Sequence, residues 1–449
     1  MTVSLDNHNL LENRSLTKRE KLNPMARRAL AAGTVGTLIE WYDYGLYGAA
    51  SALIIGPLFF SELSGSAGVL AAFATFAVGF FIRPLGGLVM AHFGDRYGRK
   101  PVLIATIVLM GAATVLMGLL PTFGQIGIWA PILLVVLRML QGAGAGAELA
   151  GAMTMVAEYA PKSRRSFVTS IPNGIAAGGV FIALLAFLAV SSLPEADMLG
   201  WGWRIPFLAS GVLFVVALYI RHRLEETPEF VQAKEKSLEE ASKHKVPLVQ
   251  LLRTHPREVI FGALSGSTHN GNFYVLTAFS VTYLTTQVGM TKTESLAAMA
   301  TASLCACLSA PIMGNIADRI GARKMYAFSG AALAVLAFPL FAALNTGNML
   351  VICAAMGACS IIVFGCGAGG QGAFLANLFP TEYRFSGIAI TRELNAMAVA
   401  GPTPFIATAL VAALHGAPWL VAGYLVLCGV VTLVSVLAVK DRYGKAGKD

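Results

Sequence analysis

Long apolar runs, separated by short polar connections, dominate the hydrophobic pattern of this chain. A helix needs about 20 apolar residues to cross the roughly 30 Å hydrocarbon core of a bilayer. Twelve runs are long enough, at approximately residues 29–60, 68–92, 101–120, 128–157, 167–190, 203–220, 258–286, 295–315, 325–344, 350–378, 387–413 and 417–438. The pattern therefore predicts an all-α membrane protein with twelve transmembrane helices.

Composition and charge agree with this class and add an orientation. The 449 residues are 56% hydrophobic and only 13% charged, and a soluble domain carries about twice that charged fraction. Lys and Arg are concentrated in the tails and alternate loops, whereas the opposite loops hold only Lys292. This positive-inside pattern predicts a multi-pass protein of the plasma (inner) membrane with both termini in the cytoplasm. The net charge of +9 therefore reflects topology and indicates no nucleic-acid partner.

Several ionisable residues fall deep within the apolar runs. Glu40 and Asp43 lie in the first run, Arg83 in the second, and Arg138 and Glu148 in the fourth. Each such charge costs about 2.5–3.5 kcal/mol at the bilayer centre on insertion scales. The set is tolerable if the side chains face one another across a water-accessible cavity, or if they form structural ion pairs between packed helices.

A glycine-rich stretch in the fourth run has a second copy later in the chain. Residues 138–148 (RMLQGAGAGAE) are matched by residues 365–371 (GCGAGGQ), so that Gln371 lies 223 positions after Glu148. The helical period places Arg138, Gln141 and Glu148 on one face, and the glycines allow a second helix to approach closely. The chain therefore consists of two related halves. No strand precedes these glycines, which argues against a nucleotide-binding loop.

A charged motif repeats at the same offset. Residues 94–100 (GDRYGRK) return as residues 317–324 (ADRIGARK), and a third pair, residues 158–165 and 377–384, is offset by 219 positions. We expect these segments to be loops that latch the cytoplasmic side and touch no substrate. The gate residues that they contribute are Gly94, Asp95, Arg96, Gly98, Arg99, Lys100, Asp318, Arg319, Gly321, Arg323, Glu158, Arg165 and Arg384.

The ordered set of motifs resembles the major facilitator superfamily. Four further segments resemble its metabolite:proton symporters, which include carriers of citrate, α-ketoglutarate, shikimate, and proline or betaine: residues 36–44 (GTLIEWYDY), 83–86 (RPLG), 201–207 (WGWRIPF) and 224–230 (LEETPEF). The resemblance implies two pseudo-symmetric six-helix bundles. It divides the chain into an N-terminal tail (1–28), a first bundle (29–220), a cytoplasmic linker (221–257), a second bundle (258–438) and a C-terminal tail (439–449).

The resemblance and the buried charges together imply proton-coupled import of a small metabolite, most simply a carboxylate. Arg83 and Arg392 are candidates to bind it, since arginine offers a planar bidentate fork. Arg392 and its neighbour Glu393 stand where the family often has an aromatic and a neutral polar residue. The expected substrate contacts are Tyr44, Arg83, Gln141, Asn173, His269, Asn272 and Arg392, and the expected proton-coupling residues are Glu40, Asp43, Arg138 and Glu148.

Other functions remain open at this point. Proline or betaine uptake, export by proton antiport, and a non-transporting membrane receptor would share the same pattern of spans. No H-E-x-x-H, G-x-x-x-x-G-K-[ST] or C-x-x-C motif is present, so we expect no enzyme activity, no cofactor and no metal. The six cysteines fall in apolar runs and are expected to be buried thiols. We expect a functional monomer whose partners are the substrate, protons and the bilayer.

Overall fold

The computed structural model describes residues 24–63, 65–97, 99–145, 157, 160–224, 248–380 and 383–439. In these residues the chain forms helices and no strands. We call residues 24–224 the N-half and residues 248–439 the C-half.

The N-half contains the first six predicted spans, the fourth as far as Ala145. The first span combines α2 (Pro24–Ala50), a π-turn η1 (Ser51–Ile55) and α3 (Gly56–Phe59). The others are α4 (Gly65–Tyr97), α5 (Arg99–Leu119), α7 (Trp129–Ala145), α9 (Arg165–Ser191) and α11 (Arg204–Leu224). The short helices α6 (Phe123–Ile126), η2 (Lys162–Arg164), α10 (Glu195–Asp197) and η3 (Met198–Gly202) lie between them.

The C-half contains the other six. A short helix α13 (Leu248–Thr254) precedes the seventh span, which is built from α14 (Pro256–Ser265), α15 (Ser267–Tyr274), η4 (Val275–Phe279), α16 (Ser280–Tyr283) and η5 (Leu284–Val288). Then come α17 (Lys292–Ile320) and α18 (Ala322–Leu344). The tenth span joins α19 (Met349–Cys359), η6 (Ser360–Gly365) and α20 (Cys366–Leu378). The last two are α21 (Arg384–Asn395), η8 (Ala396–Ala400) and α22 (Thr403–Ala413), then α23 (Trp419–Ala438).

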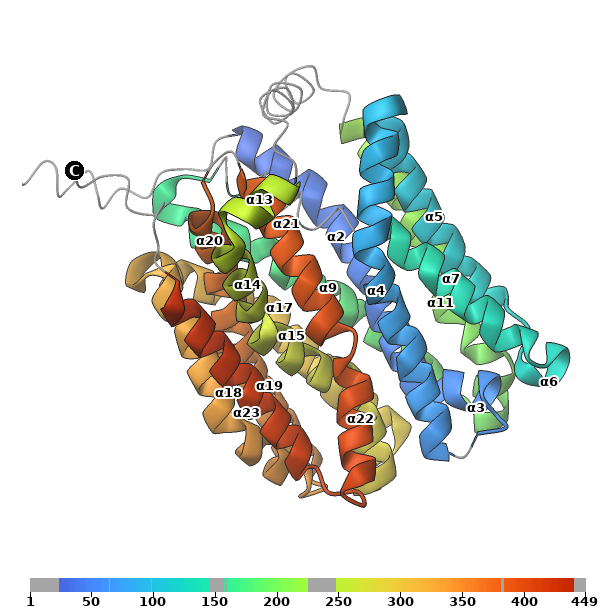
Figure 1. The fold of residues 1–449 in the computed structure, drawn as a ribbon. Coiled ribbons are helices and arrows are strands. Elements are labelled where there is room, and N and C mark those ends of the chain that lie inside the picture. The colour runs from blue at the N-terminus through green and yellow to red at the C-terminus, as the bar shows by residue number, and fades with distance from the viewer. Residues whose placement is uncertain are drawn as a thin grey trace, which may run out of the picture.

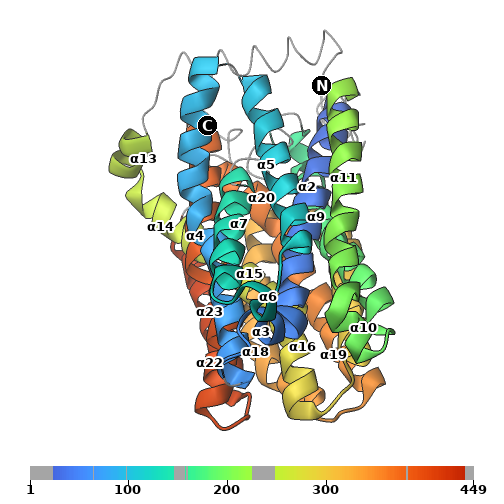
Figure 2. The ribbon, with the colours of Figure 1, turned by 90° about the vertical axis from the view of Figure 1, so that its right-hand side faces the viewer.

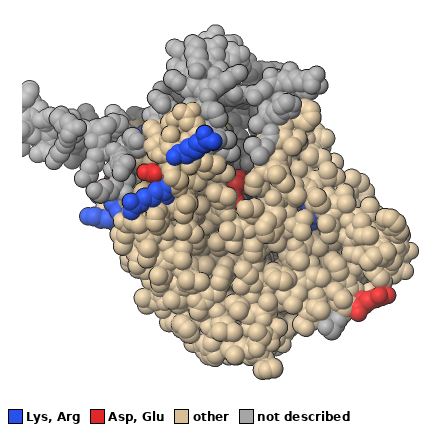
Figure 3. All heavy atoms as spheres, viewed as in Figure 1, with Lys and Arg blue, Asp and Glu red and all other residues tan. Residues whose placement is uncertain are grey.

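Length and composition alone mark eight of the described helical segments as able to cross a membrane, and two more, Ile104–Leu119 and Trp129–Ala145, as shorter apolar helices. The first and seventh spans are also helical but less apolar, because they carry Glu40, Asp43 and the polar stretch around His269. On the face that Figure 3 shows, charged side chains gather near the ends of the molecule and the broad middle is almost free of them. This surface suits a protein embedded in lipid.

The same packing pattern occurs in both halves. In the N-half, α4 packs on α7, α7 on α5, and α5 on α11. In the C-half, the corresponding contacts join α17 to α20, α20 to α18, and α18 to α23. The two halves lie side by side in Figure 1, and Figure 2 shows the long N-half helices running along the same axis. This correspondence matches the duplication that the repeated segments indicated.

The glycine-rich stretch packs helices closely, as its composition predicted. A Cβ added at Gly142 would lie 2.2 Å from the Gly79 carbonyl oxygen of α4, and one added at Gly86 would lie 2.3 Å from the backbone of Ala143. At Gly144 it would lie 2.5 Å from the Met110 side chain of α5. Only residues without a Cβ allow α7 to approach both neighbours this closely.

The halves meet mainly where α9 packs along α17, and additionally where α4 meets α22 and η4 meets α2. We call the end at which α2 begins and α23 finishes the terminal end (Figure 1). There, Asp318 accepts hydrogen bonds from the backbone N–H groups of Ser166 (2.7 Å) and Phe167 (3.0 Å), and Arg165 donates to Asn377 Oδ1 at 3.1 Å. At the opposite end, Lys292 Nζ lies 2.6 Å from Glu195 Oε1.

The repeated charged motif is mostly helical, so its prediction as a loop is wrong. Helix α17 includes Asp318 and Arg319 and ends at Ile320, Gly321 alone forms the turn with φ of +100°, and α18 begins at once. Glycine reaches this φ without a Cβ clash, so one residue suffices to separate the helices. In the first copy, α4 continues to Tyr97 and α5 begins at Arg99. Gly98 and the side chains of residues 94–97 and 99–103 lie outside the described residues.

Candidate functional site

A buried ion cluster joins the two halves at Arg83. This residue lies on α4, and Glu40 on α2 places Oε1 3.0 Å from Arg83 Nη2. Glu393, on α21 of the C-half, accepts hydrogen bonds from Arg83 Nε at 3.2 Å and Nη2 at 3.3 Å. Arg83 and Glu40 are only 4% and 1% exposed, and Glu393 is 8% exposed. Breaking such a pair by removing one partner leaves a buried charge, at a cost of about 3–5 kcal/mol.

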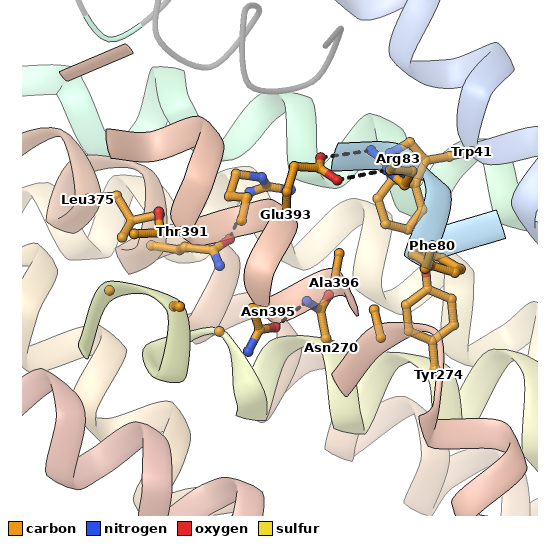
Figure 4. Close-up of a pocket in the computed structure, with 16 residues that line it drawn as sticks. Trp41, Phe80, Arg83, Asn270, Tyr274, Leu375, Thr391, Glu393, Asn395 and Ala396 are labelled. Atoms are coloured by element: carbon orange, nitrogen blue, oxygen red, sulfur yellow. Dashed lines mark hydrogen bonds and ion pairs between the residues drawn. The ribbon is translucent and has the colours of Figure 1, made fainter. Parts of the chain in front are cut away.

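The ion cluster borders a cavity between the halves. Figure 4 shows Glu393 extending toward Arg83, with Asn270 and Asn395 below them and the aromatic rings of Phe80 and Tyr274 to one side. The lining residues come from α2, α4, α14, α15, α20, α21 and η8. They are Trp41, Phe80, Arg83, Gly262, Ala263, Gly266, Asn270, Tyr274, Gln371, Leu375, Thr391, Arg392, Glu393, Asn395, Ala396 and Ala400.

The C-half contributes most of the polar groups of this cavity. Arg392 is half-buried and donates from Nη1 to Gln371 Oε1 at 3.2 Å. The Asn270 side-chain amide donates to Asn395 Oδ1 at 2.5 Å, and the Asn395 amide reaches Ser267 Oγ at 3.4 Å. A second cation and several amides therefore face the same space as Arg83.

Aromatic rings from both halves form one wall. Phe80 and Tyr274 meet edge to face with centroids 5.6 Å apart, and Trp41 stacks on Tyr274 at 6.4 Å. The Trp41 Nε1 and the Tyr274 hydroxyl are buried and have no hydrogen-bond partner among the described residues. Buried polar groups are normally hydrogen-bonded, so these two atoms are exceptions within this wall.

A second polar network lies within the N-half, away from the cavity lining. Asp43 Oδ2 accepts a hydrogen bond from Thr114 Oγ1 at 2.7 Å, and Gln141 Nε2 donates to Thr114 Oγ1 at 2.7 Å. Arg138 donates to Gln141 Oε1, and its guanidinium lies 3.9 Å from the Tyr47 ring centroid. Asp43, Arg138 and Gln141 are almost completely buried. The structure thus links the predicted acid Asp43 to Arg138 through Gln141 and Thr114.

Tyr44 connects the two networks. Its ring lies 5.2 Å from the Arg83 guanidinium carbon and 5.6 Å from that of Arg138. The ring face carries negative electrostatic potential, so it stabilises a nearby cation by about 0.5–2 kcal/mol.

The other predicted substrate residues, Asn173, His269 and Asn272, do not line the described cavity. His269 stacks on Phe364 with centroids 4.5 Å apart. Asn272 accepts a hydrogen bond from Cys359 Sγ at 3.2 Å, and the buried Asn173 amide nitrogen has no partner among the described residues. All six cysteines are free thiols, but only Cys359, Cys366 and Cys428 are buried as expected, whereas Cys305, Cys307 and Cys353 are half-buried.

The remaining predicted residues are those that the sequence assigned to a gate, together with two glutamates that the structure does not describe. Arg384 donates to the Ala376 carbonyl at 2.9 Å, and Arg323 donates to the carbonyls of Val436 and Leu437. Arg319 lies in the last turn of α17. Glu148 and Glu158 lie outside the described residues.

Sequence analysis missed several residues of this site. It noted Glu393 only as a departure from the neutral polar residue that the family often has, and it did not nominate Asn270, Asn395, Trp41 or Thr114. For Glu393 a signal was present, since a glutamate inside an apolar run is costly. For the amides and Trp41 no signal existed, because polar and aromatic residues occur throughout membrane helices.

Comparison with known proteins identifies the family. The Major Facilitator Superfamily profile matches residues 33–391 and 265–449. The chain belongs to the Major Facilitator Superfamily. The shikimate transporter of Escherichia coli is 37% identical over 418 residues, which cover 93% of this chain and 95% of the relative. The proline/betaine transporter of the same organism is 34% identical over 445 residues, covering 95% and 88%.

The fold of the family is also found among solved structures. A crystal structure of a D-xylose-proton symporter superposes with a TM-score of 0.69 at 18% identity, and covers 93% of this chain and 99% of the symporter. The predicted all-α, twelve-helix facilitator fold is therefore confirmed. The two transporter relatives also confirm the predicted resemblance to the metabolite:proton symporters. The chain is a multi-pass membrane transporter and not an enzyme.

Proposed function

We propose that this transporter imports a small carboxylate together with a proton. The observation that carries the proposal is the pair of arginines on one cavity, Arg83 from the N-half and Arg392 from the C-half. Arginine binds carboxylate through two parallel hydrogen bonds. A carboxylate held between arginines of opposite halves would bind best when the halves close around it, which links substrate binding to conformation.

Two buried sites offer a carboxylate for the coupled proton. One is Asp43, whose Oδ1 has no hydrogen-bond partner among the described residues and whose Oδ2 is held by Thr114 and Gln141. The other is the cluster of Glu40, Arg83 and Glu393. Carboxylates inside membrane spans mark proton pathways. Glu148, which the sequence also nominated, remains a candidate by its position alone.

The movement that we propose is a rocking of two bundles, residues 29–220 and 258–438, about the cavity, with residues 221–257 as their link. The contacts of Asp318 with Ser166 and Phe167 support a latch at the terminal end. Because Lys and Arg favour the cytoplasmic side, we assign the terminal end and both termini to the cytoplasm. We propose that a monomer performs the full cycle, since the cavity is formed within one chain.

A second candidate substrate is a zwitterionic osmolyte such as proline or betaine. The relative at 34% identity is a proline/betaine transporter, and an aromatic wall of Trp41, Phe80 and Tyr274 lines the cavity here. Aromatic faces bind quaternary ammonium groups through cation–π attraction. The arginines would then hold the carboxylate of the zwitterion, so both candidates use the same end of the site.

An uptake screen tests the proposal. The purified protein in proteoliposomes with an inward proton gradient is offered citrate, α-ketoglutarate, shikimate, benzoate, proline and betaine. We expect gradient-dependent accumulation of at least one anionic carboxylate, and a loss of about tenfold or more in Arg392→Gln, because truncating one partner of a buried charge pair costs about 2–5 kcal/mol.

The matched control is Arg257→Gln, at an exposed arginine of α14 that does not line the cavity. It should transport as the wild type does. Accumulation of proline and betaine alone would favour the osmolyte candidate. Efflux driven by the same gradient would indicate an exporter, and binding of a compound without movement would indicate a receptor.

A further inference from the structure

Arg83 is occupied in this structure by carboxylates from both halves. The guanidinium contacts Glu40 of its own half and Glu393 of the other half. Glu393 uses both carboxylate oxygens, one on Nε and one on Nη2. This two-point contact is the arrangement that a bound carboxylate substrate would adopt. A substrate carboxylate can therefore accept these same two hydrogen bonds from Arg83 only if Glu393 gives them up.

Glu40 and Glu393 differ in their access to the cavity. Glu393 lines the cavity, whereas Glu40 does not. The side chain of Glu393 is 11% exposed and that of Glu40 is 1% exposed. The helix that carries Glu393 is also followed directly by the π-turn η8, whose Ala396 and Ala400 line the cavity. Single π-turns frequently occur at functional sites, and this one places irregular backbone one turn from Glu393.

The local charges balance before substrate enters. Arg83 and Arg392 supply two positive charges, and Glu40 and Glu393 supply two negative charges. An anionic substrate would add one negative charge to a site buried in the membrane, where an uncompensated charge is costly. One proton taken up by a carboxylate of this cluster restores the balance.

We propose that Glu393 occupies the substrate's place at Arg83, and that the incoming carboxylate displaces it as Glu393 takes up the coupled proton. This inference rests on the proposed carboxylate symport and assigns its coupling to one residue that the sequence did not nominate.

The step balances in atoms and charge. The substrate carboxylate accepts the two hydrogen bonds from Arg83 that Glu393 gives up. A proton from water on the side of entry forms an O–H bond with one Glu393 oxygen, and no electron is transferred. After the halves rock, release of the substrate and of this proton lets Glu393 return to Arg83. Substrate and proton are thus carried together because each requires the other.

Other ionisable groups near Glu393 set its electrostatic surroundings. They come from several elements, α2, α4, α15, α18 and α21 itself, and are Glu40, Tyr44, Arg83, Tyr274, Tyr326 and Arg392. Of the two carboxylates, Glu40 and Glu393, only Glu393 lines the described cavity. Substrate displaces it directly, whereas Glu40 can keep its contact with Arg83 Nη2.

The experiment uses Glu393→Gln, which resembles the protonated acid. The ligand is the compound of the uptake screen that the wild type accumulates most. Its binding affinity is measured in detergent from pH 5 to pH 9. In the wild type, affinity should fall about tenfold per pH unit in the upper part of this range, because one proton is bound with the substrate. In Glu393→Gln the affinity should be nearly independent of pH.

Two transport assays accompany the binding measurement. Exchange of labelled for unlabelled substrate at equal pH on both sides requires no net proton movement, so Glu393→Gln should retain it. Accumulation driven by a pH gradient should be lost. Glu258→Gln on α14, a carboxylate that pairs with His255 away from the cavity, is the matched control and should behave as the wild type in all three assays.

The outcomes separate this inference from the function on which it rests. If the wild type accumulates none of the six compounds, that result contradicts both the proposed symport and the inference that rests on it. If the wild type accumulates one of them but the affinity of Glu393→Gln keeps the wild-type pH dependence, the proton binds to another acid such as Asp43. That result overturns only the role of Glu393. Equal losses of exchange and accumulation would make the ion pair merely structural.

Discussion

At the scale of single residues, Arg83 forms a buried ion pair between the two halves. Two buried carboxylates share its guanidinium, and the Tyr44 ring lies 5.2 Å away. The three ionised side chains lose hydration in this position, and their mutual contacts compensate for part of that loss. The sequence indicated that Arg83 and Glu40 lie within the membrane, and either a cavity or ion pairs would have made them tolerable. The structure contains both, since the ion pairs border the cavity.

A double-mutant cycle at this point measures the dependence of the two charges on each other. Arg83→Gln leaves two carboxylates without their cation and should reduce stability in detergent by about 3–5 kcal/mol. Adding Glu393→Gln to that variant should restore part of the loss, since it removes one uncompensated charge. Thermal denaturation followed by tryptophan fluorescence provides the measurement. If the double variant is less stable than Arg83→Gln alone, the charges are not coupled as described.

At the scale of helices, hydropathy predicted where spans occur but not which faces meet. Apolar runs of about 20 residues suffice to locate a span, and each of the twelve is helical as far as it is described. The contact between Arg83 and Glu393 joins residues 310 positions apart. No local sequence pattern predicts this contact, because the contact depends on how the two halves dock. The glycine-rich stretch was more informative, since missing Cβ atoms directly indicate close packing.

The packing of α7 on α4 yields a prediction of its own. Gly142→Ala would place a Cβ 2.2 Å from the Gly79 carbonyl oxygen, so the helices must separate at a cost of about 1–3 kcal/mol or more. We expect a clear fall in the melting temperature in detergent. Gly423→Ala, on α23 with no atom within 4 Å of the new Cβ, is the control and should be neutral or slightly stabilising. Equal melting temperatures for the two variants would contradict the close packing.

At the scale of the whole molecule, contacts between the halves occur at both ends. The exposed pair of Lys292 and Glu195 contributes at most about 1 kcal/mol. The hydrogen bonds from backbone N–H groups to the Asp318 carboxylate involve a charged acceptor and are worth about 1.5–3 kcal/mol each. The contacts at the terminal end are therefore the stronger of the two sets, although each is weak enough to be broken and remade during transport.

The central claim is that substrate and proton move in the same direction through the cavity between the halves. Its most direct test uses proteoliposomes that contain a pH-sensitive dye, with equal pH on both sides. The accumulated carboxylate is added outside, and protein-free liposomes control for leakage of the undissociated acid. The account predicts that the lumen acidifies as substrate enters, and that Arg392→Gln reduces the signal about tenfold or more. Entry without acidification, or with a rise in luminal pH, would contradict it.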